Sequence, residues 1–228
     1  MQIFKDITHI FFPNICMCCK NTLKNNEKII CSYCLHELPL TNYTLTNSNA
    51  VLKIFYGRIA LENATALLYY HKKGIVQNLI HNLKYRNQQT IGSFIGKWLG
   101  TEMKESNQFT NIDYIVPIPL HKKRLKERGY NQVTTFGKVL AKILDVSYIE
   151  NVIIRKSANK TQTHKGRFDR WKNVTELFYL TNLSFFENKH ILLIDDIITT
   201  GATIEACYNE LIKTKNIKIS IAVMAITV

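Results

Sequence analysis

The chain has 228 residues, of which 46% are hydrophobic and 21% charged, a composition that excludes an intrinsically disordered protein. Its length allows one ordinary α/β domain and a small additional one. The 30 lysines and arginines outnumber the 17 acidic residues, and the net charge of +13 favours nucleic acid, phosphorylated substrates or an acidic membrane surface as partners. No apolar stretch is long enough for a transmembrane segment and no secretory signal is visible, so we expect a cytoplasmic protein.

Residues 1–45 are predicted to form a small zinc-binding domain. Apolar residues at helical spacing between Ile3 and Phe11 predict a helix that ends before Pro13. Two Cys-x-x-Cys pairs follow, separated by 11 residues. Clustered cysteines in a reducing compartment indicate a metal more often than disulfides, and four thiolates suit tetrahedral zinc. Cys18 can replace a neighbour, but the ligands of one structural Zn²⁺ are predicted to be Cys16, Cys19, Cys31 and Cys34.

The middle of the chain begins with a polar, Thr/Asn-rich stretch, residues 40–55, which is predicted to be a linker. A strand is expected within 56–70. Apolar residues at helical spacing then predict two helices, one over 75–83 and one over 91–103. Their apolar stripes indicate core packing.

A second strand is predicted at 112–119, where Pro117 and Pro119 end it because proline cannot donate to a strand ladder. A strongly basic loop follows, 121–132, and then a helix over 133–143 and a strand within 146–154. Ligands bind beyond the carboxyl ends of parallel strands, so this loop should line the same crevice as other strand-end motifs. The alternative is an ordinary solvated charge run.

The basic connection 155–178 is long for a compact domain, which indicates a functional lid or a flexible loop. The most informative stretch follows it. Four apolar residues, 191–194, predict a strand buried on both faces, after which come Asp195 and Asp196 and then a Thr/Gly loop, 199–203. A helix should start there, and 217–226 should form the last strand.

Strand, acidic pair, loop and helix N-terminus together predict a site for a phosphorylated ligand that carries hydroxyl groups. Loop amides and the helix dipole hold phosphate, and carboxylates accept hydrogen bonds from sugar hydroxyls or help to hold Mg²⁺. An acidic turn with a threonine N-cap is the plainer alternative, but it does not account for two adjacent aspartates followed by Thr-Thr-Gly-x-Thr.

The stretch 191–203 resembles the PRPP-binding motif of type I phosphoribosyltransferases. The resemblance implies an α/β fold, with a parallel sheet flanked by helices, over residues 46–228. The whole chain resembles the ComF family, whose members join a zinc finger to such a domain and are associated with DNA uptake in natural transformation. The stretches that carry this resemblance are the two cysteine pairs, Lys84-Tyr85-Arg86, Val116–His121, Arg124 with Arg128–Gln132, Gln162–Asn173 and the Asp195-Asp196 motif. Cys18 and His164 depart from the family pattern.

The resemblance assigns a role to each part of the site. Asp195 and Asp196 would bind the ribose hydroxyls and Mg²⁺, and Arg124 and Arg128 would face the pyrophosphate. Lys156, Gln162 and Arg167 would arrive on the lid. The 5′-phosphate would be cradled by Ile198, Thr199, Thr200, Gly201, Ala202 and Thr203.

We therefore expect a PRPP-binding phosphoribosyltransferase that acts in competence, with an acceptor that the sequence does not identify. A non-catalytic module that binds nucleic acid or a nucleotide is the alternative, and a scaffold that joins DNA-translocation proteins at the inner face of the membrane is a third. Single-stranded DNA is an expected partner in the second case.

Overall fold

The computed structural model describes residues 13–46, 49–155 and 178–228. Its elements in chain order are α2 (Ser32–His36), α3 (Ala50–Phe55), β1 (Ala64–Tyr70), α4 (Ile75–Tyr85), α5 (Thr90–Glu105), β2 (Tyr114–Pro117), α6 (Lys122–Arg128), α7 (Thr134–Leu144), β3 (Ser147–Tyr148), β4 (Ile153–Arg155), β5 (Phe178–Leu180), η1 (Ser184–Phe186), β6 (His190–Ile198), α9 (Ala202–Leu211) and β7 (Lys218–Thr227).

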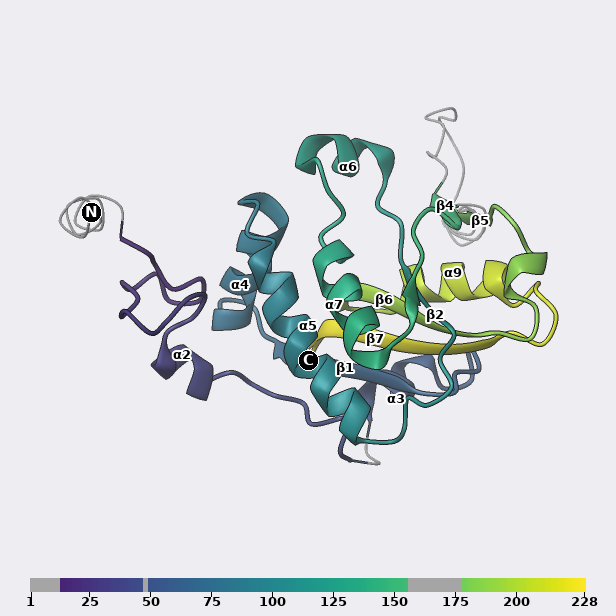
Figure 1. Ribbon diagram of the computed structural model, residues 1–228, viewed down its shortest axis with the longest axis horizontal. Helices are drawn as coiled ribbons and strands as arrows, with labels where there is room; N and C mark the ends of the chain where they lie inside the picture. The colour runs from purple at the N-terminus through teal and green to yellow at the C-terminus, as the bar shows by residue number, and fades with distance from the viewer. Residues whose placement is uncertain (1–12, 47–48, 156–177) are drawn as a thin grey trace, which may run out of the picture.

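A parallel sheet of five strands forms the centre of the fold, with the strand order β1-β7-β6-β2-β3 (Figure 1). β6 lies between β7 and β2, with Ile115 opposite Leu192 and Asp195 opposite Val223. The apolar run 191–194 is buried on both faces, as expected for a central parallel strand. The predicted α/β fold, a parallel sheet flanked by helices, is confirmed.

Helices cover both faces of this sheet. Leu192 and Ile194 pack with residues of α4, α5 and α7, and Ile191 and Leu193 point the other way, toward α3 and α9. α5 and α7 approach closely at Gly96, where a Cβ atom would lie 2.9 Å from the carbonyl oxygen of Phe136. The candidate site lies at the carboxyl ends of β2 and β6, where residues from both faces of the sheet contribute to it.

The predicted linker at 40–55 is wrong, because this stretch is largely structured. Residues 39–41 run along β1, where Tyr69 N–H donates to Pro39 O at 2.8 Å and Thr41 N–H to Leu67 O at 3.0 Å. The side chain of Asn49 then accepts from the N–H of Val51 and begins α3, which buries Phe55.

The basic loop at 121–132 also differs from the prediction, because it contains the helix α6. The His121 side chain accepts from Lys123 N–H at the start, and Gly129, at φ 76°, ends the helix in the left-handed region. Lysine, arginine, leucine and glutamate are good helix formers, so the charge run has high helix propensity.

Two strand predictions need adjustment. The stretch 146–154 holds two short strands: β3 extends the parallel sheet, whereas β4 pairs with β5 in a separate antiparallel ribbon. β6 continues through Ile198, so Asp195 and Asp196 lie inside the last part of the strand and not after it. The helices predicted over 75–83 and 91–103, and the last strand, are confirmed as α4, α5 and β7.

The helix predicted between Ile3 and Phe11 and the lid predicted at 155–178 lie, except for Arg155 and Phe178, outside the described residues. Within the described part of the chain, no helix has the length and apolar character needed to cross a bilayer. The division between residues 45 and 46 remains a prediction.

Candidate phosphoribosyl site and zinc centre

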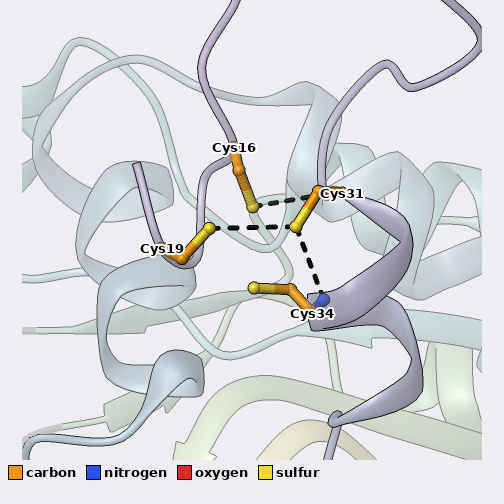
Figure 2. A group of neighbouring side chains, drawn as sticks. All are labelled: Cys16, Cys19, Cys31 and Cys34. Carbon is orange, nitrogen blue, oxygen red and sulfur yellow. Dashed lines mark hydrogen bonds between the residues drawn. The ribbon is translucent and has the colours of Figure 1, made fainter. Parts of the chain in front are cut away.

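Four cysteine sulfur atoms converge near the start of the described chain (Figure 2). The Sγ atoms of Cys16, Cys19, Cys31 and Cys34 all lie within 4.8 Å of one another. Zn–S bonds of 2.3 Å in a tetrahedron place sulfur atoms about 3.8 Å apart. The Cys19 and Cys31 sulfur atoms are 3.8 Å apart, so the cluster has the size that zinc requires.

Backbone N–H groups hold these sulfur atoms in place. Cys16 Sγ accepts from Cys18 N at 3.4 Å and from Cys31 N at 3.3 Å, and Cys31 Sγ accepts from Cys34 N at 3.5 Å. The Cys18 sulfur atom is not part of the cluster. Burial, followed by the charges of Cys16 and Cys19, raises the pKa of Cys18 to about 12, which favours a neutral thiol there. The four predicted ligands thus lie together, and Cys18 lies outside their cluster.

The loop after β6 forms a small polar hollow at the N-terminus of α9. The cavity has a volume of about 40 Å³ and is lined by Asp195 and residues 197–204. Every PRPP-binding residue predicted in 198–203 therefore lines one concavity. α9 has ten residues, so its dipole adds a positive field at this end.

Helix α3 supports this loop from behind. Gly201 has φ 76°, and a Cβ atom there would lie 2.5 Å from the Phe55 ring. Arg58 donates to Thr200 O at 2.9 Å and forms an ion pair with Glu205. The loop is thus fixed by side chains that are distant in sequence, with Arg58 lying 142 positions from Thr200.

Asp195 and Asp196 point to opposite faces of the sheet, because neighbouring residues in a strand alternate. Asp196 is only 5% exposed and is fully partnered. Its Oδ1 lies 2.8 Å from Lys84 Nζ, and its Oδ2 accepts from Gln132 Nε2 at 2.5 Å. Gln132 in turn accepts from Arg128 at 2.7 Å.

Asp195 lines the polar hollow and has a different electrostatic environment. Burial, followed by the neighbouring Asp196 carboxylate, raises the pKa of Asp195 to about 7. The Asp196 N–H, at 2.8 Å from Asp195 Oδ1, and the charges of Lys84 and Arg155 only partly offset this. The pair therefore divides into an ion-paired aspartate and one that titrates near neutral pH.

A cationic cavity adjoins the ion-paired aspartate. Its volume is about 270 Å³, and four cationic side chains face it against one carboxylate, that of Glu127. The Arg128 guanidinium also lies 5.0 Å from the centre of the Tyr85 ring. The residues that line the cavity are Lys84, Tyr85, Arg86, Asn87, Arg124, Glu127, Arg128 and Tyr130. Such a concentration of guanidinium and ammonium groups suits a di- or polyphosphate.

A larger cavity, of about 620 Å³, lies on the other side of α6, and Pro119, Leu125, Ile154 and Arg155 are among the residues that line it. Its walls are largely apolar, and its volume is in the range of small-molecule sites. Burial, followed by the charge of Arg124, lowers the pKa of Arg155, whose guanidinium lies 5.5 Å from the Phe178 ring.

The structure thus brings together Asp195, Asp196, Arg124, Arg128 and the loop 198–203. Lys156, Gln162 and Arg167 lie outside the described residues. Sequence reasoning did not assign Lys84 or Gln132 as partners of Asp196, although both lie in stretches that carry the family resemblance. Arg58 and Phe55 gave no signal at all, because their contacts with the loop are purely tertiary.

Known proteins resemble this chain in sequence. The family model of the phosphoribosyl transferase domain matches residues 134–226. Competence protein F of Haemophilus influenzae is 31% identical over 130 residues, which cover 55% of this chain and 57% of that protein. Competence protein ComFC of Bacillus subtilis is 28% identical over 193 residues, or 83% of this chain and 74% of that protein.

DNA utilization protein YhgH of Escherichia coli is 29% identical over 129 residues, which cover 55% of this chain and 56% of that protein. The matches thus span little more than half the length of competence protein F and of YhgH. The predicted phosphoribosyltransferase fold agrees with the parallel sheet and with the family model. The chain is thus similar to competence proteins of the ComF type, and its residues 134–226 match the phosphoribosyl transferase domain.

Proposed function

We propose that this chain binds PRPP, or a related nucleotide, together with Mg²⁺, and that it acts in DNA uptake as a cytoplasmic ComF-type protein. The observation that carries the proposal is the continuity of three features: the hollow at 197–204, the Asp195-Asp196 pair and the cationic cavity. A 5′-phosphate, a ribose and a pyrophosphate lie in that order along PRPP.

The 5′-phosphate would occupy the hollow at the N-terminus of α9. The loop amides and the hydroxyls of Thr199, Thr200 and Thr203 are its donors, and the helix dipole adds to the attraction. Gly201 allows the left-handed backbone conformation that the loop needs, and its missing Cβ leaves room for the Phe55 ring behind the loop.

The ribose hydroxyls would meet the aspartates. The carboxylate of Asp195, at the edge of the hollow, offers the hard oxygen ligands that Mg²⁺ prefers, so the chemistry of the site fits this ion. Bound Mg²⁺ supplies positive charge to PRPP oxygens. The ion pair with Lys84 and the hydrogen bond from Gln132 hold the Asp196 side chain in place at the end of β6.

The pyrophosphate would lie in the cationic cavity beside Arg124 and Arg128. In phosphoribosyl transfer a nucleophile forms a bond to ribose C1′, and the bond from C1′ to the pyrophosphate oxygen breaks with its electron pair moving to pyrophosphate. The guanidinium groups would stabilise that charge as it develops. Lys156 and the other cations at 156–177 are proposed to add to this set.

A binding module without catalysis is the second candidate. Tyr85 is 64% exposed and lies among Lys84, Arg86 and Arg128, a mixture of aromatic and basic groups that suits single-stranded nucleic acid. In this case DNA-translocation proteins at the inner face of the membrane would be partners.

Titration with the two halves of PRPP tests the assignment of the site. Ribose 5-phosphate should bind weakly, and Thr200→Val should weaken it. Pyrophosphate should bind separately, and Arg124→Gln should weaken that binding alone. If Arg124→Gln weakens ribose 5-phosphate and not pyrophosphate, the order of the subsites is wrong.

A further inference from the structure

Two asparagines of α4 join this helix to the first cysteine turn. Asn78 Nδ2 donates to Cys18 O at 2.7 Å, and Asn82 Nδ2 donates to Met17 O at 2.9 Å. They are four residues apart and therefore lie on the same side of the helix. Both carbonyl groups belong to the turn between the ligands Cys16 and Cys19. Asn82 is only 7% exposed, so it is a buried polar group whose side chain has a specific use.

Apolar packing reinforces these hydrogen bonds. Leu23, Ile30 and Leu38, from the segment around the cysteines, belong to the same buried cluster as Leu79 and Leu83 of α4. Figure 1 shows the cysteine segment and α2 beside α4, at the side of the sheet. We call residues 13–38 the knuckle. It rests on α4 through a continuous core and two side-chain hydrogen bonds.

The end of the same helix contributes residues to the candidate site. Lys84 forms the ion pair with Asp196 and, with Tyr85 and Arg86, lines the cationic cavity. The backbone of Asn82 closes the end of the helix, because Asn82 O accepts from the N–H groups of Arg86 at 3.0 Å and Gln88 at 3.4 Å. One residue thus bonds to the knuckle with its side chain and closes the turn that presents Lys84 with its backbone.

We infer that Asn78 and Asn82 are positioning residues, through which the zinc-bound knuckle sets the place of Lys84 at the phosphoribosyl site. The inference rests on the proposed function for its ligand, PRPP. It gives the knuckle a role in ligand binding although none of its cysteines lines the cavities described above.

In a four-cysteine turn, the binding of zinc and the folding of the chain are coupled. Without the metal, the four thiols have no common partner and the turn that presents Met17 O and Cys18 O loses its order. Asn78 and Asn82 then lose their acceptors, and α4 loses apolar contacts along one side. Lys84 lies only two residues after Asn82, so the position of its side chain is then no longer fixed.

The test compares the wild type with Asn78→Ala/Asn82→Ala and with Gln77→Ala, in the first turn of the same helix, where the side chain accepts from the N–H of Lys73. Alanine has a higher helix propensity than asparagine, so the double substitution does not weaken α4 intrinsically. The measurements are zinc content, affinity for PRPP, pyrophosphate and ribose 5-phosphate, and hydrogen exchange of the amides of residues 84–86. A wild-type sample stripped of zinc by a chelator is measured alongside.

The double variant should keep its zinc, bind PRPP and pyrophosphate about three- to tenfold more weakly, and bind ribose 5-phosphate as before. Its amides at 84–86 should exchange faster, as they should in the stripped protein, and Gln77→Ala should resemble the wild type. An equal loss for ribose 5-phosphate indicates general damage and overturns the inference, as do unchanged affinities.

Wild-type protein that binds no PRPP would refute the proposed function instead. The hydrogen-exchange measurement then still tests whether the knuckle fixes the end of α4 through Asn78 and Asn82. Unchanged protection at 84–86, both in the double variant and without zinc, overturns it.

Discussion

Replacing Asp195 by asparagine should stabilise the protein above pH 7, and the gain should vanish toward pH 4. Burial and the Asp196 carboxylate raise the pKa of Asp195 from 3.8 to about 7. Between these values the folded protein binds a proton that the unfolded chain has released, so wild-type stability falls as the pH rises through this window. Asparagine has no charge to lose, and its oxygen can still accept the Asp196 N–H.

The size of the effect follows from the displacement of the pKa. Each unit corresponds to about 1.4 kcal/mol, so the change sets an upper limit of about 4 kcal/mol above pH 7. Water at the open edge of the hollow screens part of the repulsion, and we therefore expect on the order of 1–3 kcal/mol in the free energy of unfolding.

Urea unfolding at pH 5, 7 and 8 measures this difference, and Asp113→Asn provides a control of opposite sign. Burial opposes ionisation of Asp113, but the His190 N–H and the Lys189 ammonium outweigh it and lower its pKa. Asp113→Asn should therefore cost about the same stability at pH 5, 7 and 8, because all three lie above the lowered pKa. The reasoning is refuted if Asp195→Asn is no more stable than the wild type at pH 8, or if its advantage is the same at pH 5.

The remaining predictions concern the metal, the loop and the surface charge. Protein purified without added zinc should contain one Zn²⁺ per chain by metal analysis; Cys31→Ser should lose the metal, and Cys18→Ser should keep it. Gly201→Ala should lower the free energy of unfolding by about 1–3 kcal/mol in urea titrations, because its Cβ meets Phe55, whereas Gly57→Ala has a similar positive φ but open space and should cost less. Binding to single-stranded DNA should weaken with salt, with a slope of about −0.7 in log affinity against log salt for each phosphate neutralised; absence of binding at low salt contradicts the electrostatic account.

The sequence was informative where the functional residues are neighbours in the chain. Asp195, Asp196 and the Thr/Gly loop form one contiguous motif, and the four cysteines form two short pairs, so each group could be assigned before any fold was known. The partners of these groups could not be assigned in that way. Lys84 lies 112 positions from Asp196 and Arg58 lies 142 positions from Thr200, and such contacts depend on how helices pack on the sheet.

Local signals were also missed where two of them competed. In α6 the charge run predicts a basic loop at the crevice, although its residues are good helix formers with a His cap and a C-terminal glycine. In β6 the acidic pair predicts the end of the strand, whereas the ladder with β7 continues to Ile198. That difference matters for function, because a continuing strand turns the two aspartates to opposite faces and gives them different partners.

Calorimetric titration of PRPP in the presence of Mg²⁺ tests the central claim most directly. The wild type should bind with one site per chain, and Asp195→Asn/Asp196→Asn should lose this binding while remaining folded by circular dichroism. Asp195→Asn alone should weaken binding most at pH 8, where the wild-type carboxylate is ionised. Wild-type protein that binds no PRPP, or a double variant that binds it equally well, would contradict the account.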